Sequence, residues 1–396
     1  MSEVARWSQR SVDPWLLYAQ QAREGFQKTP PEVPMLVGYG VPSYSLSTPE
    51  NISIKDALLR FGPVPIMVHG QLVYLKSRNE RVPAGASLLS GAQQFDMCIA
   101  SRDGYYIRQA DHLILEDPEH GRYLAGCIKD AIVVELCIGS GEKSKRLLTQ
   151  ARQLGSKPTR YVINDMVRDS LNAAKKAICD VYPVERVRPV LADVFHTEFD
   201  ATLRDAIGNS SAPIVVLLQG GTIGNFTKDE TDVLLDLLRN ALKPGDKLIV
   251  SADSTRHLKT LKRAYDRSAD KQFFVGAFVF ACHIAGLDGL NQDAIDCKID
   301  FSLKTKDQIE VKIINTEPQH LGPRSGPSVS LLPGSLRAGL MCKRNPKGWA
   351  KKFKQHAFHL TRVMPARIPK KVQETHPALK KMFRHVQHNY LVFELR

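Results

Sequence analysis

Short apolar runs alternate with longer stretches of mixed apolar and polar residues between positions 132 and 252. The short runs fit strands that are buried on both faces, and the mixed stretches fit amphipathic helices packed on a sheet. This alternation predicts a mostly parallel sheet, with ligands bound at the carboxyl ends of its strands. The predicted strands lie at 132–136, 160–165, 187–192, 212–219 and 247–252.

The turn after the first predicted strand carries the most informative motif. Glu135 closes the apolar run, and Gly139 and Gly141 precede a predicted helix. Glycines at such a turn let the backbone approach a ligand closely, while the missing Gly-Lys-Thr argues against a P-loop. The Glu-x-x-x-Gly-x-Gly spacing resembles the S-adenosylmethionine (SAM) loop of class I methyltransferases. A strand-to-helix turn with incidental glycines is the alternative.

Polar residues follow the next three strands at positions suited to a nucleoside. Asp165 ends the second strand, where a carboxylate can accept hydrogen bonds from a ribose diol, or it caps a helix predicted at 166–177. Asp193 follows the third strand, where it could bind an adenine amino group while Val194 covers the ring. The fourth strand runs into Gly220-Gly-Thr-Ile-Gly-Asn225.

Several strings resemble one methyltransferase family, which comprises the histidine-specific Nα-methyltransferase of ergothioneine biosynthesis and the fungal dimethylallyltryptophan N-methyltransferases. The family's SAM loop reads Val-Glu-Leu-Gly-x-Gly-x-Gly-x-Lys-Thr, and its motif after strand four reads Gly-Ser-Thr-Ile-Gly-Asn. The resemblance covers about residues 95–315 and implies a class I fold with SAM as cofactor. The similar strings are Phe95–Tyr106, Val134–Ser144, Gly220–Asn225, Arg263–Asp266 and the predicted hairpin Cys297–Ile313.

The motif and the resemblance together assign candidate roles to individual residues. Asn225 and Tyr265 would be the catalytic residues that hold the acceptor amine, and Tyr106 and Gly221 would line the same pocket. These residue types suit methyl transfer, because an amine lone pair needs positioning rather than a protein nucleophile or a metal. The residues expected to contact SAM are Glu135, Gly139, Gly141, Lys143, Asp165, Asp193, Val194 and Gly220.

The chain departs from the family pattern at three places. Cys137 replaces the first glycine of the SAM loop, and Tyr105–Gln109 replaces the family's Tyr-Tyr-Pro-Thr-Arg. The family's late Thr-Glu-x-Ser, whose Glu and Ser bind the imidazole of histidine, has no clear counterpart. We therefore expect an amino acid or a related small amine as acceptor, without assigning histidine.

Composition limits the remaining choices. With 396 residues and 43% hydrophobic residues, the chain can bury a large core and is expected to form two domains. Its seven cysteines are dispersed, without the spacing of a zinc site or disulfide framework, and its start lacks the apolar segment of a signal peptide. No apolar run approaches the length of a membrane span. We therefore expect a cytoplasmic protein.

Positive charge is concentrated near the C-terminus. Residues 337–384 contain fourteen Lys or Arg and one acid, whereas the whole chain has a formal net charge of +14. Such a segment could bind nucleic acid or another acidic partner, with interleaved aromatic residues stacking on bases. The alternative, which we favour, is a solvated surface whose aromatic residues turn into the core. The aromatic residues in question are Trp349, Phe353, Phe358 and Phe383.

The predicted architecture is a doubly wound, mostly parallel Rossmann-like sheet with a second, smaller α+β substrate domain. The accessory region would contain a helix near Asp13 and a hairpin at 65–75, and residues 389–396 would form a final strand at the sheet edge. The predicted parts are 1–94 as an accessory or lid region, 95–255 as the SAM-binding domain, 256–330 as a substrate-domain insertion and 331–396 as a basic C-terminal segment.

The leading functional prediction is SAM-dependent N-methylation of an amino acid or a related small amine. One alternative is a methyltransferase that uses the basic segment to act on nucleic acid or protein. A second is transfer or cyclisation of the aminobutyryl arm of SAM, which would release methylthioadenosine. A third is a binding protein without catalysis. The sequence does not predict the oligomeric state or the number of methyl groups added.

Overall fold

The protein is described by a computed structural model in which the chain forms two compact units. The smaller unit comprises 1–98, 268–300 and 310–339, and the larger comprises 99–267, 301–309 and 340–396. The helix predicted near Asp13 and the hairpin predicted at 65–75 lie outside the described residues. The described residues are 106–165, 168–192, 194–195, 199–267, 270–276, 279, 289–301, 307–321, 329–331, 334–368, 374, 380–381 and 383–396.

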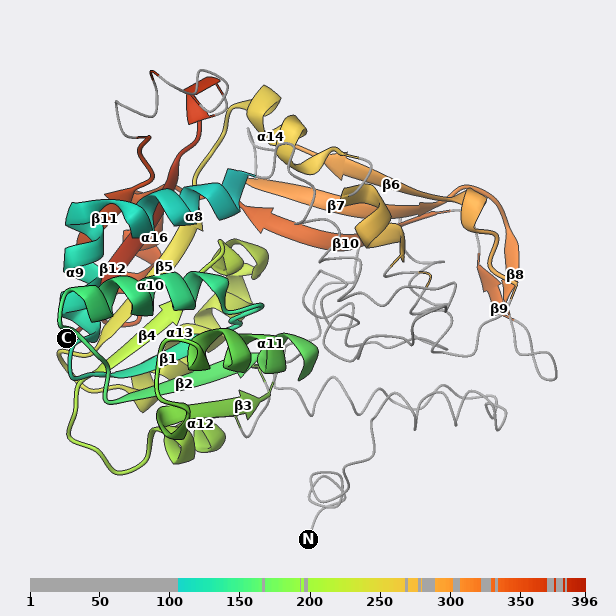
Figure 1. The fold of residues 1–396 in the computed structure, drawn as a ribbon. Helices are drawn as coiled ribbons and strands as arrows, with labels where there is room; N and C mark the ends of the chain where they lie inside the picture. The colour runs from blue at the N-terminus through green and yellow to red at the C-terminus, as the bar shows by residue number, and fades with distance from the viewer. Residues whose placement is uncertain are drawn as a thin grey trace, which may run out of the picture. The chain divides into compact units, whose positions relative to one another are not determined.

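The larger unit contains a seven-stranded sheet in the order β11-β12-β5-β4-β1-β2-β3 (Figure 1). The first five strands in the sequence are parallel, and β12 is antiparallel to both of its neighbours. This mostly parallel, Rossmann-like order confirms the predicted fold class. The strands are β1 Ile132–Leu136, β2 Arg160–Asp165, β3 Val187–Leu191, β4 Ile214–Leu218, β5 Lys247–Asp253, β11 Phe358–Pro365 and β12 His388–Leu395.

The prediction that the final strand lies at the sheet edge is wrong. β12 pairs with β5 on one side and with β11 on the other, so its backbone groups are bonded on both sides. β11 forms the edge instead, and it carries the exposed Thr361 and the half-buried Arg362. The sequence prediction did not include β11, whose alternation of apolar and polar residues is interrupted at Thr361 and Arg362, where the pairing register shifts.

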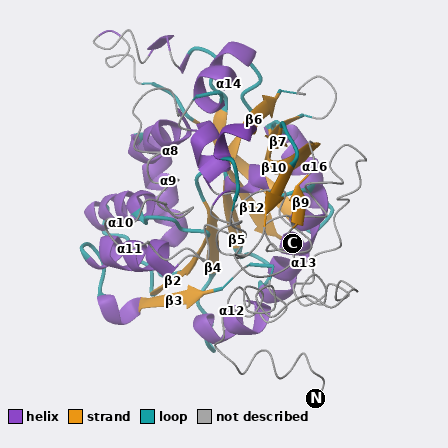
Figure 2. Cartoon of the chain, turned by 90° about the vertical axis from the view of Figure 1, so that its right-hand side faces the viewer, coloured by secondary structure: helices purple, strands orange, loops and turns teal. Residues whose placement is uncertain are grey.

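Helices cover both faces of this sheet, which Figure 2 shows between two helical layers. The first layer contains α8 Tyr106–Glu116, α9 Pro118–Ile128, α10 Glu142–Gln153 and α11 Arg168–Cys179. The second contains α12 Phe199–Ile207, α13 Lys228–Ala241 and α16 Pro346–Lys354, while α14 Leu258–Tyr265 follows β5. Two short 3-10 helices, η2 Val184–Arg186 and η3 Thr222–Asn225, complete the described elements of this unit.

Local sequence explains where several of these helices begin. The Thr227 side chain accepts a hydrogen bond from the Glu230 N–H, and the Glu230 carboxylate accepts one from the Thr227 N–H, which forms a capping box for α13. Asp117 caps α9, and proline occupies the first turn of that helix. None of the described helices is long and apolar enough to cross a membrane.

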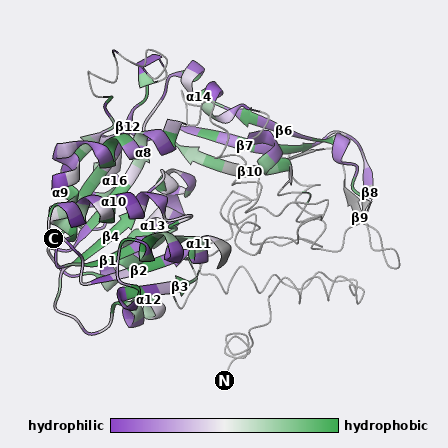
Figure 3. Ribbon diagram, viewed as in Figure 1, coloured by the Kyte–Doolittle hydropathy of each residue, from purple (hydrophilic) through white to green (hydrophobic). Residues whose placement is uncertain are grey.

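The core lies between the sheet and its helices, where the strands of Figure 3 are predominantly hydrophobic. Every residue of β1 and β4 is buried, as expected for central strands with helices on both faces. Residues of β1, β2, α9, α10 and α11 form one continuous apolar cluster. β1 and β4, which precede the two glycine-containing turns, are therefore the most enclosed strands of the sheet.

The remaining strands lie largely in the smaller unit, and the pairs β6–β7 and β8–β9 are antiparallel. The predicted hairpin is confirmed, because Ile295 pairs with Asn315 and Asp300 with Glu310 in an antiparallel register. Its strands belong to a three-stranded sheet in the order β10-β7-β6, and a separate pair is formed by β8 and β9. The elements are η4 Gln292–Ala294, β6 Ile295–Asp300, β7 Gln308–Asn315, β8 Gln319–Leu321, β9 Val329–Leu331 and β10 Gly334–Cys342.

The basic C-terminal segment has buried aromatic residues, as the favoured alternative predicts. Trp349 and Phe353 pack edge to face on α16, and Phe353 stacks on Phe393 of β12. Trp349, Phe353, Phe358 and Phe383 are at most 9% exposed. Their rings belong to the core, so they do not provide a surface on which nucleic acid bases could stack.

Part of the positive charge of this segment is also internal. Lys352 on α16 pairs with Asp232 on α13, and its side chain is only 6% exposed. His356 Nε2 lies 2.6 Å from Asp232 Oδ1, and its Nδ1 lies 2.8 Å from Asp236 Oδ1. Burial opposes ionisation of Asp232, but its bonds to Lys352 and His356 hold its pKa below the usual value. This cluster joins α16 to α13.

Gly141, the residue before α10, is required by close packing as well as by backbone conformation. Its φ is +76°, and an added Cβ atom would lie 2.7 Å from the Ala174 Cα atom in α11. Gly155, after the end of α10, has a similar φ of +68°, but no atom lies within 4 Å of its Cβ position. A comparison of substitutions at the two glycines therefore separates the cost of left-handed backbone strain from the cost of steric overlap.

We expect Gly141→Ala to lower the free energy of unfolding by about 2–4 kcal/mol, because left-handed strain and displacement of α11 add. Gly155→Ala should cost about 1 kcal/mol, since only the strain applies. Urea denaturation of both variants measures the difference. Equal losses would contradict the close contact between Gly141 and α11.

Candidate functional site

The candidate site begins at the loop between β1 and α10. Cys137 and Gly139 both have left-handed backbones, with φ of +53° and +65°. The Ile138 N–H donates to the Asn164 carbonyl over 3.0 Å, and the Gly139 N–H donates to Asp165 Oδ2 over 2.9 Å. The end of β2 thus holds the loop in place, and Asp165 lies directly beside the predicted glycine.

Space above this loop is consistent with a bound ligand. A Cβ atom added to Gly139 would meet no atom within 4 Å, whereas Gly141 is packed tightly against α11. The Asp165 carboxylate is bonded to this loop, and from this position it could accept hydrogen bonds from a ribose diol. Val194, predicted to cover the adenine ring, is 4% exposed. Asp193 lies outside the described residues.

Glu135 faces the interior below the same loop. Its Oε2 accepts hydrogen bonds from Ser144 Oγ at 2.5 Å and Tyr161 Oη at 2.7 Å. Burial raises the pKa of Glu135 and outweighs these hydrogen bonds. The carboxyl group therefore ties the start of α10 to β1 and β2, which gives it a structural contribution that the motif alone did not indicate.

The turn after β4 lies next to the start of α10. Gly220 and Gly221 have φ of +76° and +73°, and a Cβ atom on Gly220 would lie 3.5 Å from Lys143 Nζ. On Gly221, a Cβ atom would lie 3.7 Å from Ile107, the residue after Tyr106. The structure therefore brings Lys143, both glycines and the start of α8 together.

Asn225 lies in η3, immediately after these glycines, and is half-buried. The neighbouring Gly224 packs closely against the last residue of β10, because its Cβ position lies 3.0 Å from the Cys342 carbonyl oxygen. That contact places the Asn225 turn beside the segment that carries Lys343.

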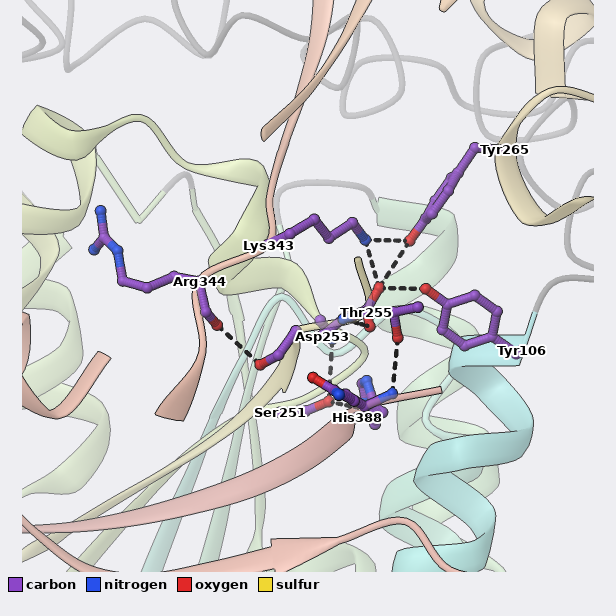
Figure 4. A network of polar contacts seen from close by, with 11 residues as sticks. Tyr106, Ser251, Asp253, Thr255, Tyr265, Lys343, Arg344 and His388 are labelled. Atoms are coloured by element: carbon purple, nitrogen blue, oxygen red, sulfur yellow. Dashed lines mark hydrogen bonds and ion pairs between the residues drawn. The ribbon is translucent and has the colours of Figure 1, made fainter. Parts of the chain in front are cut away.

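Both predicted tyrosines meet at Asp253, the last residue of β5 (Figure 4). Tyr106 Oη donates to Asp253 Oδ2 over 2.6 Å, and Tyr265 Oη lies 3.4 Å from the same oxygen. Lys343 Nζ pairs with Asp253 Oδ2 and donates to Tyr265 Oη over 2.8 Å. The Thr255 N–H donates to Asp253 Oδ1 over 3.0 Å. All four ionisable side chains are nearly inaccessible to solvent.

The Lys343 charge decides the ionisation of Asp253. Burial alone would raise the pKa of Asp253, but the Lys343 ammonium, His388 and the Tyr106 hydrogen bond hold it below the usual value. Asp253 is therefore an ionised carboxylate at neutral pH, despite being 5% exposed. Lys343 also lies 4.4 Å from the Tyr265 ring centroid, in cation–π contact.

A second polar network continues from this cluster. His388 Nε2 lies 2.7 Å from Asp111 Oδ1 and 2.8 Å from Ser251 Oγ, and Ser251 Oγ accepts a hydrogen bond from the Gly221 N–H. A catalytic triad would use both ring nitrogens of the histidine and an accessible serine. Here one nitrogen makes both contacts and all three side chains are buried, so the network supports the Gly221 turn.

Sequence reasoning missed Asp253, Lys343, Asp111, Ser251 and His388. One signal was available for Asp253, since it ends the fifth strand as Asp165 ends the second. The other members come from α8, β5, β12 and the segment after β10, and no spacing in the sequence connects them. No group of His, Cys, Asp and Glu in the described part of the chain has the arrangement of a metal site.

Known proteins are similar to slightly less than half of this chain. The 31%-identical histidine N-alpha-methyltransferase of Mycobacterium tuberculosis (strain CDC 1551 / Oshkosh) aligns over 44% of this chain and 51% of its own length. The L-tryptophan methyltransferase of Psilocybe serbica is 27% identical over 47% of this chain and 56% of its own length. The 4-dimethylallyltryptophan N-methyltransferase of Aspergillus fumigatus is 28% identical over 45% of this chain and 52% of its own length. The chain thus spans about half the length of the curated relatives it matches.

A family model described as histidine-specific methyltransferase, SAM-dependent, matches residues 89–336, which is more than half of the chain. This range contains the SAM loop, the Gly220–Asn225 turn and Tyr265, and the predicted family is thereby confirmed. The chain belongs to the family of SAM-dependent, histidine-specific methyltransferases.

Proposed function

We propose that this protein is a SAM-dependent N-methyltransferase that acts on the α-amine of an amino acid or on a related small amine. The observation that carries the proposal is the meeting of the Gly220–Asn225 turn with the SAM loop on one side and with the Tyr106 end of α8 on the other. The named relatives methylate histidine, tryptophan or a prenylated tryptophan, and these acceptors share an α-amino acid group.

The residues present fit SAM as the methyl donor. The loop at Gly139 leaves open space, Lys143 lies beside Gly220, and Asp165 borders the same loop with its carboxylate. SAM, when bound, supplies a methyl group on a sulfonium, which an amine lone pair can displace in line. The chain has to hold SAM and to place a neutral amine in line with that methyl group.

The acceptor would be held by residues from three elements. The Asn225 carbonyl and the Tyr265 hydroxyl would accept hydrogen bonds from the amine N–H groups, which leaves the lone pair free to react. Tyr106 would close the same pocket, and Gly221 would let the acceptor approach the backbone. The proton released after each transfer would pass to solvent or to a nearby acceptor.

The direct test is mass spectrometry of both products after incubation of the protein with SAM and pooled amino acids. S-adenosylhomocysteine together with an amino acid heavier by one or more methyl groups would support the proposal and identify the acceptor. Methylthioadenosine would instead support reaction at the aminobutyryl arm. Turnover only with nucleic acid or protein would overturn the small-molecule assignment.

We expect Asn225→Ala to abolish acceptor turnover, because the amine loses a hydrogen bond that orients its lone pair. SAM affinity should stay within about tenfold, or ~1.4 kcal/mol, of the wild-type value. Steady-state rates and SAM calorimetry measure the two effects. Asn240→Ala, on the exposed end of α13, is the matched control and should leave both unchanged. Near-normal turnover of Asn225→Ala would remove Asn225 from the mechanism.

We expect Asp165→Asn to weaken SAM binding by about 10- to 100-fold, since a charged hydrogen bond contributes ~1.5–3 kcal/mol. The Asn oxygen can still accept the Gly139 N–H, so the loop should keep its shape. Asp180→Asn, which removes an exposed carboxylate paired with Lys145, is the control. Calorimetry with unchanged SAM affinity in Asp165→Asn would limit Asp165 to a role in shaping the loop.

A further inference from the structure

The buried Lys343–Asp253 pair touches both tyrosines of the proposed acceptor pocket. Its members come from β5 and from the segment after β10, and the tyrosines come from α8 and α14. The side chains of Lys343 and Asp253 are 2% and 4% exposed. An ion pair enclosed to this degree contributes little net stability compared with apolar packing, so stability alone does not explain it.

Asp253 controls where the hydroxyl protons of the tyrosines point. A carboxylate only accepts hydrogen bonds, so Tyr106 must donate its proton to Asp253, and Tyr265 lies within reach of the same oxygen. An ammonium only donates, so Lys343 must occupy a lone pair of the Tyr265 oxygen. A tyrosine hydroxyl whose proton is committed to Asp253 can interact with an acceptor only through its oxygen lone pairs, and these suit the N–H groups of an amine.

A carboxylate beside an amine also has an unwanted effect. An opposite charge within about 4–6 Å favours the protonated form of an amine and raises its pKa by about 1–3 units. A protonated amine has no lone pair and cannot accept a methyl group. A site that uses Asp253 to orient its tyrosines therefore needs a positively charged group paired with the same carboxylate.

We infer that Lys343 and Asp253 are positioning residues that orient the Tyr106 and Tyr265 hydroxyls toward the acceptor while keeping that acceptor as the neutral, nucleophilic amine. This inference rests on the proposed function and adds to it the reason why the pair is ionic. Asp253 supplies the hydrogen-bond acceptor for the tyrosines, and Lys343 cancels its charge.

The other ionisable groups around the pair do not replace Lys343. His388 from β12 helps to lower the pKa of Asp253, but its Nε2 atom contacts Asp111 and Ser251 instead of Asp253. Asp111 from α8 adds a second carboxylate nearby, and its pKa is also held low by His388 against the effect of burial. Among the residues that the structure describes, Tyr106 and Tyr265 are the remaining titratable groups in contact with Asp253. Within the same part of the chain, Lys343 is the cation bonded directly to Asp253.

The test is the pH dependence of kcat at saturating SAM, measured from the N-methylated product. In Lys343→Met, the uncompensated carboxylate should shift the rise of kcat to higher pH by about one unit or more, with at least a tenfold loss below that rise. Lys343→Arg should retain the wild-type profile, because it keeps the charge. In the double variant Lys343→Met/Asp253→Asn, the profile should return toward the wild-type position, since the Asn oxygen still accepts from a tyrosine.

Asp253→Asn alone gives an independent arm that does not need the Lys343→Met variant to fold. It leaves a positive charge beside the amine, so the rise of kcat should shift to lower pH. Lys352→Met is the control, because it breaks a second lysine–aspartate pair of the same unit, in which the lysine is buried and the aspartate is half-buried. It should reduce stability and leave the pH profile of kcat unchanged.

The outcomes separate the inference from the proposed function. A wild-type protein that forms no N-methylated product contradicts the proposed function and, with it, the inference. An active wild type whose profile coincides with those of folded Lys343→Met and Asp253→Asn overturns the inference alone. Opposite shifts in the two single variants, with partial return in the double variant, are the result that the inference requires.

Discussion

Burial of polar side chains at the carboxyl edge of the parallel sheet is the constraint on which the site depends. An ionised carboxylate without a partner is too costly to bury. The chain meets this requirement in different ways. Glu135 is bonded to two hydroxyl groups and its pKa is raised by burial, whereas Asp253 is paired with Lys343 and its pKa is lowered. The partners of each acid therefore determine the charge of the site.

The parts that the sequence predicted are those set by local pattern. Continuous apolar runs indicate buried strands, and the glycines at the ends of β1 and β4 indicate left-handed turns, as the φ values at Gly139 and Gly220 show. Asp253 could have been found by the rule that selected Asp165. Lys343 and His388 could not, because they meet β5 across 90 and 137 residues, respectively, and no local pattern connects either residue with β5. Strand order alone brings them together.

The formal charge of the C-terminal segment was also misleading, because contacts with distant parts of the chain cannot be seen in the sequence. A lysine contributes one positive charge to composition whether it is solvated or buried against an acid. Lys343 and Lys352 are buried counter-ions of Asp253 and Asp232, and Arg362 is paired with Glu119. The segment therefore contributes to the core and to the candidate site, and its formal charge overstates the charge that it presents to solvent.

Cys137 shows how the fold tolerates a departure from the family motif at the SAM loop. A left-handed conformation costs a residue with a side chain about 1–2 kcal/mol relative to glycine. Such strain persists only where the surrounding structure leaves no alternative. The next two backbone N–H groups, of Ile138 and Gly139, are both bonded to the last two residues of β2. Pairing with β2 thus sets the shape of the loop, and glycine at position 137 is a preference rather than a requirement.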